Sequence, residues 1–306
     1  MVTIFRRYIL ISLGLGLLAA CGGGGGGEPL SPAPVDNGLP FAQEGDTLEQ
    51  FQNRSADVTV VRHVMDYDGS TPRIVIGLAT LTVGAFQGDG PLINVDPTMT
   101  LEFGGETLSF VEGSAIDEDG KLWSAYISST GDVSGTAGFY HYDYGSGVEP
   151  FDTEGLFAFG FLTDPETLVD RDDIAAYSGN WFGYGVVTNG GTTILQNEAI
   201  GGGTFILTAN FEKALVSGTL TGSYDSFGRV DGALLESDLI ENAFAGDFAL
   251  TCGTGATCSS NTVVGGAFFG FDGAEVSGAI GFDERRTISG DTRRLVSSAG
   301  YTLSQN

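Results

Sequence analysis

The sequence has little of what most catalytic and metal-binding sites are built from. Its 306 residues include 2 His, 3 Cys and 2 Trp, and 13 basic side chains stand against 39 acidic ones, for a formal charge of −26. A surface this acidic repels phosphate backbones, so we expect no nucleic-acid partner. The sequence contains no Gly-x-Ser-x-Gly, His-Glu-x-x-His or phosphate-binding Gly-Lys-Ser/Thr motif. We therefore expect a protein that is not an enzyme.

Glycine and apolar residues are abundant by contrast. The chain has 49 Gly and 21 Phe, and 42% of its residues are hydrophobic. The glycines follow no Gly-X-Y period, which excludes collagen. The apolar content is too high for a disordered acidic chain. At roughly 100–200 residues per domain, the length suggests two modest domains.

Residues 1–20 are predicted to be a secretory signal. Arg6 and Arg7 form a positive start, and the apolar run at 8–18 that follows is shorter than the roughly 20 residues of a membrane-spanning helix. The run ends in Leu18-Ala19-Ala20-Cys21. This sequence resembles the lipobox of bacterial lipoproteins, which implies that Cys21 is lipidated and becomes the mature N-terminus. The alternative is an ordinary signal peptide in which Cys21 is incidental.

Residues 21–46 are predicted to form a tether behind that anchor. Six consecutive glycines at 22–27 are maximally flexible, and the four prolines between 28 and 40 make the rest stiffer and more extended. By resemblance to enterobacterial sorting, a Gly rather than an Asp at position 22 implies the outer membrane. Such a tether holds a folded part away from the lipid surface.

From about residue 47 the sequence is typical of strands and turns. Five segments are rich in β-branched and aromatic residues, and Asp-Gly and Gly-Gly turn signals separate them. A short helix is expected at Pro165, with Asp164 as its cap, and it would divide the strands into two halves. The five strand candidates are residues 57–62, 74–83, 98–103, 107–111 and 122–128.

The second half alternates between apolar and polar residues with period two. Phe205, Leu207, Ala209 and Phe211 lie on one predicted face, and residues 244–250 and 276–282 repeat the pattern. This period indicates half-buried antiparallel strands, about eight of them, and glycines within them suit a small closed barrel. A membrane-spanning barrel also alternates, but a protein inserted in that way needs no acyl anchor.

Five motifs in this half occur in a recognisable order. They are residues 177–184 (YSGNWFGY), 210–222 with NF and then VSGTLTG, 242–246 (NAFAG), 265–270 (GGAFFG) and 273–281 (GAEVSGAIG). Together they resemble the β-barrel domain of transferrin-binding protein B and its relatives. The lipobox followed by glycines is similar to surface lipoproteins of the same group.

The resemblance implies an all-β chain, with a strand-rich handle domain at 47–165 and an eight-stranded antiparallel barrel at 166–306. It implies a lipid-anchored binding protein on the outer membrane that captures an iron carrier, haem or another host protein and passes it to a membrane transporter. This chain has one handle and barrel rather than two lobes. The matched motifs are structural, so no ligand-binding residue carries over. A structural or adhesive envelope lipoprotein with no small-molecule ligand is the alternative.

Cys252 and Cys258 are predicted to form a disulfide. Only five residues lie between them, and a secreted protein meets an oxidising compartment. A metal site would need a further His or Cys nearby, and the sequence offers none.

His63, His141 and Tyr142 are the candidate haem or metal ligands. His141 stands in a Tyr-rich stretch, and both His and Tyr can ligate haem iron. The alternative is a strand face with aromatic and polar side chains.

The Asp-Gly sequences at 66–69 and 117–120 resemble the starts of calcium loops but lack the downstream Glu, which favours hairpin turns. We therefore predict no resident cofactor or metal, with haem or iron as a candidate ligand.

Overall fold

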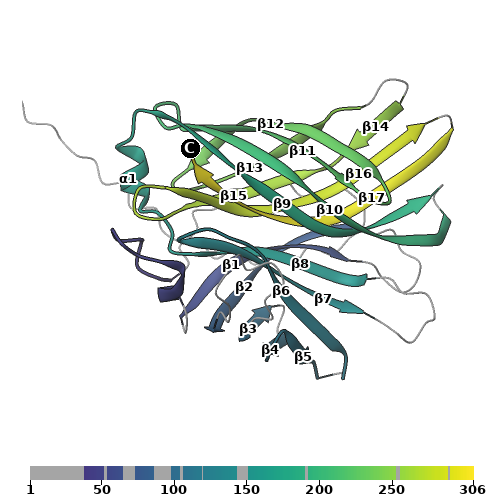
Figure 1. Ribbon diagram of the computed structural model, residues 1–306, viewed down its shortest axis with the longest axis horizontal. Coiled ribbons are helices and arrows are strands. Elements are labelled where there is room, and N and C mark those ends of the chain that lie inside the picture. Colours follow the sequence, from purple (N-terminus) through teal and green to yellow (C-terminus); the bar gives the residue numbers. More distant parts are fainter. Residues whose placement is uncertain are drawn as a thin grey trace, which may run out of the picture.

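The protein is built almost entirely from two antiparallel sheets that lie one against the other (Figure 1). The computed structural model describes residues 38–51, 54–64, 73–85, 98–103, 106–118, 120–142, 151–189, 192–252, 256–288 and 290–306. Within these ranges no helix has both the length and the apolar character needed to cross a bilayer.

The first sheet, which we call the handle, has eight strands in the order β4-β3-β2-β1-β8-β7-β6-β5. The edge strands β4 and β5 follow each other in sequence, and a bridge between Val111 and Ser114 brings their ends together, so the sheet is nearly closed. The strands are β1 (Ser55–Val64), β2 (Arg73–Ala85), β3 (Thr98–Phe103), β4 (Glu106–Phe110), β5 (Ser114–Ile116), β6 (Leu122–Thr130), β7 (Ser134–Tyr142) and β8 (Phe151–Gly160).

The handle has its own apolar core. The 3-10 helix η1 (Leu48–Phe51) contributes Phe51, whose ring lies 5.7 Å from the rings of both Phe159 and Phe161. Alternate residues of the strands point inward toward it, such as Leu101 and Leu108, and both are fully buried. Period-two burial is what a half-buried sheet requires.

The second sheet closes into a barrel. Strands β9 to β13 and β15 to β17 form a ring of eight, in which β17 pairs with both β16 and β9. Strand β14 lies outside this count and pairs with the C-terminal part of β16, beyond the part that pairs with β15. The strands are β9 (Ile174–Asn189), β10 (Thr192–Asn210), β11 (Leu215–Tyr224), β12 (Gly228–Ile240), β13 (Ala243–Leu250), β14 (Ala256–Ser260), β15 (Val263–Phe269), β16 (Glu275–Ile288) and β17 (Asp291–Gln305). The predicted all-β fold with an eight-stranded barrel is confirmed.

Aromatic side chains fill the barrel. Trp181, Tyr224 and Phe282 pack ring against ring at 5.5–5.6 Å, and all three are buried. Glycines let the strands approach one another: a Cβ on Gly278 would overlap the carbonyl oxygen of Gly265 and the hydroxyl of Tyr301. The barrel is therefore a packed core rather than an open tube.

A short helix and its flanking residues connect the two sheets. Helix α1 (Pro165–Val169) begins where the sequence predicts, because the side chain of Asp164 accepts a hydrogen bond from the N–H of Glu166. Just before it, Leu162 pairs with Phe269 of β15, and the Thr163 hydroxyl donates to the Gly270 carbonyl at 2.7 Å. The connection is thus part of the barrel wall rather than a free linker.

Candidate functional site

Three large apolar side chains stand exposed at one corner of the handle. Val111, Ile116 and Leu122 are between 48% and 71% exposed. Ile116 and Leu122 are directly paired across β5 and β6, and the Val111–Ser114 bridge places Val111 beside the same strands. Side chains directly opposite in an antiparallel pair share a face at about 5 Å. We call these three residues the handle corner.

The handle corner rests on a fixed polar and aromatic support. Trp123 follows Leu122 and points inward, where its ring lies 5.2 Å from that of His141 and its Nε1–H donates to Asp117 at 2.9 Å. The other carboxylate oxygen of Asp117 accepts the N–H of Lys121 at 2.8 Å, which closes the β5–β6 hairpin. The predicted hairpin turn at 117–120 is therefore confirmed.

His141 is a buried residue whose imidazole holds the strand of the handle corner. Its Nδ1 lies 2.7 Å from the carbonyl oxygen of Leu122. A carbonyl can only accept, so Nδ1 carries the proton and donates it. These contacts make His141 a support for Leu122 in the described structure.

A buried carboxylate clamps the handle to the barrel. Glu275 begins β16 and is only 4% exposed. Its oxygens accept from the N–H of Asp132 at 2.5 Å, the N–H of Ser134 at 2.9 Å and the Ser134 hydroxyl at 2.7 Å. The handle turn comes so close that a side chain on Gly131 would overlap this carboxylate. With the N–H of Val133 at 3.3 Å, four backbone or hydroxyl donors surround one carboxylate and fix the orientation of the two sheets.

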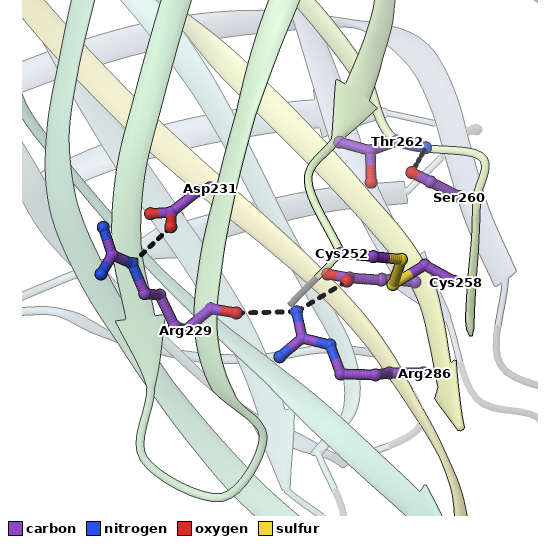
Figure 2. Close-up of polar contacts among 8 residues, drawn as sticks. Arg229, Asp231, Cys252, Cys258, Ser260, Thr262 and Arg286 are labelled. Atoms are coloured by element: carbon purple, nitrogen blue, oxygen red, sulfur yellow. Dashed lines mark hydrogen bonds and ion pairs between the residues drawn. A yellow bond between two sulfur atoms is a disulfide. The ribbon is translucent and has the colours of Figure 1, made fainter. Parts of the chain in front are cut away.

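The end of the barrel away from Glu275 holds a cluster of charged residues beside the disulfide (Figure 2). The Arg286 guanidinium donates to Glu284 at 2.9 Å and to the Arg229 carbonyl at 2.7 Å, and it lies 4.8 Å from the ring centroid of Phe227. Arg229 in turn forms an ion pair with Asp231. These charged side chains at the barrel mouth are therefore paired with one another.

Burial shapes the chemistry of that cluster. Glu284 is fully buried, and the loss of hydration raises its pKa above the ordinary value, although Arg286 works in the opposite direction. Among the described residues, one Glu284 oxygen and the Thr262 hydroxyl have no hydrogen-bond partner. The mouth is therefore polar inside, unlike the aromatic middle of the barrel.

The structure places the residues singled out from the sequence as follows. Cys252 and Cys258 form a disulfide with a Cα–Cα distance of 5.9 Å (Figure 2). Cys21 lies outside the described residues. His63 and Tyr142 belong to strands β1 and β7, but their side chains lie outside the described part. Across the described ranges, no group of three or more His, Cys, Asp or Glu side chains is arranged to hold a metal ion.

Two features of the site have only faint signals in the sequence. Ile116 ends the three-residue strand β5, where alternation is too brief to assign a face, and its exposed partner Leu122 is the first residue of β6. Glu275 lies in a motif that resembles the family pattern, yet its partners are some 140 residues away in the chain. The one local signal for a buried role of Glu275 is that it lies between the apolar residues Ala274 and Val276.

The second sheet can now be compared with known proteins. Residues 170–300 match the family model described as the C-lobe and N-lobe β-barrels of transferrin-binding protein B. The barrel is a transferrin-binding-protein-B-like domain. The order of motifs along β9 to β16 and the closed ring of eight strands agree with that assignment. The comparison with curated proteins finds no match to this chain.

Solved structures of transferrin-binding protein B are also similar to this chain. A mutant of this vaccine antigen from Haemophilus parasuis Hp5 is 13% identical, covers 81% of the chain and gives a TM-score of 0.46. The isotype 1 protein from serogroup B Neisseria meningitidis is 16% identical, covers 82% and gives 0.44. The chain spans 45% and 44% of the length of these two structures.

Proposed function

We propose that the protein is a lipid-anchored outer-membrane surface protein that binds a protein ligand through the handle corner. The transferrin-binding-protein-B-like barrel supports a binding function, and the lipobox-like sequence ending at Cys21 supports the anchor. A host iron carrier is the ligand class that the resemblance favours. Delivery of the cargo to a membrane transporter is the accompanying proposal.

One observation carries the choice of surface. Scattered exposed apolar residues are ordinary, but Val111, Ile116 and Leu122 are adjacent and stand on a strongly acidic protein. Adjacent apolar side chains that stay exposed are typical of protein interaction sites. Trp123 and His141 hold the backbone at Leu122 in place before binding, which reduces the ordering entropy that association costs.

The contacts of His141 favour a protein ligand over haem at this position. Its ring is buried against Trp123, and its Nδ1–H is bonded to the strand. Haem ligation by His141 would require the ring to leave that packing. A haem titration followed by absorbance tests this directly, and a Soret shift that disappears in His141→Ala would make haem the ligand instead.

The binding experiment compares the wild-type chain with Ile116→Ser/Leu122→Ser. Iron-loaded transferrin, haemoglobin and haem are the probes on a biosensor, and Ile206→Ser/Leu235→Ser removes two exposed aliphatic side chains from the barrel wall as a matched control. We expect one carrier protein to bind, with affinity reduced at least about tenfold by the handle-corner variant and unchanged by the control. Binding that survives the handle-corner variant would refute the choice of surface.

Anchoring is tested separately. Added protease should remove the protein from intact cells, while Cys21→Ala should release it from the membrane fraction. If no carrier or haem binds while anchoring is confirmed, the alternative of a structural or adhesive envelope lipoprotein is correct.

A further inference from the structure

A second set of exposed apolar side chains belongs to the end of the barrel that carries α1, a helix whose place Figure 1 shows. Val169, Ile174 and Phe271 are between 49% and 76% exposed. They come from three segments: the end of α1, the start of β9 and the turn between β15 and β16. We call these three residues the basal platform.

A single arginine holds the three segments together. Arg171 makes two bonds to the carboxylate of Asp173, at 2.8 and 2.7 Å, and a third to the carbonyl of Asp272 at 2.8 Å. Its guanidinium also lies 4.0 Å from the ring centroid of Phe211. Asp173 precedes Ile174, and Asp272 follows Phe271, so the arginine links the segment before Ile174 to the turn that carries Phe271.

Two further hydrogen bonds fix the turn that carries Phe271. The Tyr177 hydroxyl donates to the Gly273 carbonyl at 2.8 Å, and burial raises the pKa of Tyr177 to about 12. The N–H of Gly270 donates to the Phe161 carbonyl at 3.0 Å. Phe271 is thus an exposed aromatic side chain on a rigid turn, which is the form that interface anchors take.

Acidic residues flank the three platform residues along the chain. The two segments 164–174 and 270–274 contain six carboxylates and one base, Arg171, whose hydrogen bonds all go to neighbouring acceptors. The carboxylates are Asp164, Glu166, Asp170, Asp172, Asp173 and Asp272. Such a rim repels an anionic lipid surface and a second copy of the same platform, and it attracts cations.

We propose that the basal platform docks a cationic amphipathic segment of another protein, in which apolar side chains are flanked by Lys or Arg. The apolar side chains of that partner would cover Phe271, Val169 and Ile174, and its cations would meet the acidic rim. Charge steers the encounter, and the apolar contacts determine the lifetime of the complex. This surface is separate from the handle corner, so the inference does not depend on the ligand proposed above.

The test uses the full chain with Cys21→Ala and two synthetic amphipathic helices, one of leucine and lysine and one of leucine and glutamate. We expect only the lysine peptide to bind, and its affinity to fall at least about tenfold between roughly 50 and 500 mM NaCl. Val169→Ser/Ile174→Ser/Phe271→Ser should weaken binding at least about tenfold. Ile200→Ser, which removes an exposed aliphatic side chain toward the other end of the barrel, should leave binding unchanged.

Further measurements distinguish the cationic segment from a lipid surface or a second copy of the chain as the partner of the platform. Asp170→Asn/Asp172→Asn/Asp272→Asn leaves the apolar residues in place and should remove most of the salt dependence. Circular dichroism and urea midpoints confirm that each variant is folded. Equal binding of both peptides, or full binding by the triple serine variant, overturns the proposal. So does flotation with phosphatidylglycerol vesicles, or dimerisation in size-exclusion chromatography, if the triple serine variant abolishes it.

Discussion

Replacing Glu275 with alanine should loosen the handle from the barrel by about 2 kcal/mol. The carboxylate accepts from the N–H and the hydroxyl of Ser134, and both residues are buried. A buried donor that loses its partner costs about 1–3 kcal/mol. The Ser134 N–H loses this acceptor, which gives the estimate of about 2 kcal/mol, whereas the Ser134 hydroxyl can still donate to the Ser277 hydroxyl 2.7 Å away. The N–H groups of Asp132 and Val133 are less buried and can turn to water.

The two tryptophans make the measurement specific. Trp123 belongs to the handle core and Trp181 to the barrel core, and the sequence has no other tryptophan. Trp181→Phe leaves a fluorescence reporter in the handle, and Trp123→Phe leaves one in the barrel. In urea unfolding we expect the two reporters to coincide for the otherwise unchanged protein, because the sheets share a clamped interface.

With Glu275→Ala, the Trp123 transition should move to lower urea and separate from the Trp181 transition. The barrel keeps its own closed ring of hydrogen bonds, so its transition should move less. Glu275→Gln keeps one acceptor and should cost less than alanine. The exposed Glu236→Ala is the matched control and should change stability by under about 0.5 kcal/mol. If Glu275→Ala moves both reporters together, or by no more than the control, the clamp does not join the sheets.

Three further perturbations test the barrel. Gly278→Ala should destabilise it by about 2 kcal/mol in urea unfolding, because the new Cβ meets backbone that cannot move, whereas Gly202→Ala, with only one close contact, should cost less. Cys252→Ser/Cys258→Ser should lower the unfolding free energy by about 2 kcal/mol, and an effect equal to that of added reductant would confirm that the disulfide is responsible. Burial raises the pKa of Glu284, so the folded protein binds this proton more tightly than the unfolded chain does. Stability should therefore fall as the pH rises from the ordinary Glu pKa of about 4.3 toward the raised value. Glu284→Gln should lack the fall that begins near the ordinary Glu pKa, and an equal fall in both proteins would contradict the assignment.

Local patterns were sufficient to predict the barrel. Phe205, Leu207 and Ala209 all point into its core, and Ile206 between them is 46% exposed, as the alternation predicts. The cap at Asp164 and the turn at 117–120 were also readable, because both depend on contacts between near neighbours in sequence.

The surface by which the barrel meets the handle could not be predicted in this way. Ser277 and Ala279 lie on the outer face of β16, where alternation indicates solvent, yet both are buried against the handle. Ala279 packs with Val61 and Leu156, which lie far away in the chain. A small residue on an outer face is compatible with water or with a second sheet, and only the tertiary structure distinguishes the two.

The filled interior of the barrel determines where a ligand can bind. Phe205 and Tyr301 stand edge to face at 4.9 Å in the middle of the ring, and Trp181 and Phe282 pack above them with no exposure of more than 1%. Opening a space there would break aromatic contacts worth about 0.5–1.5 kcal/mol per pair, besides the cost of the lost burial. Binding on the outer surface costs none of this. The handle corner and the basal platform already present apolar side chains on fixed backbone, so ligand capture by this protein is best sought on its outer surface.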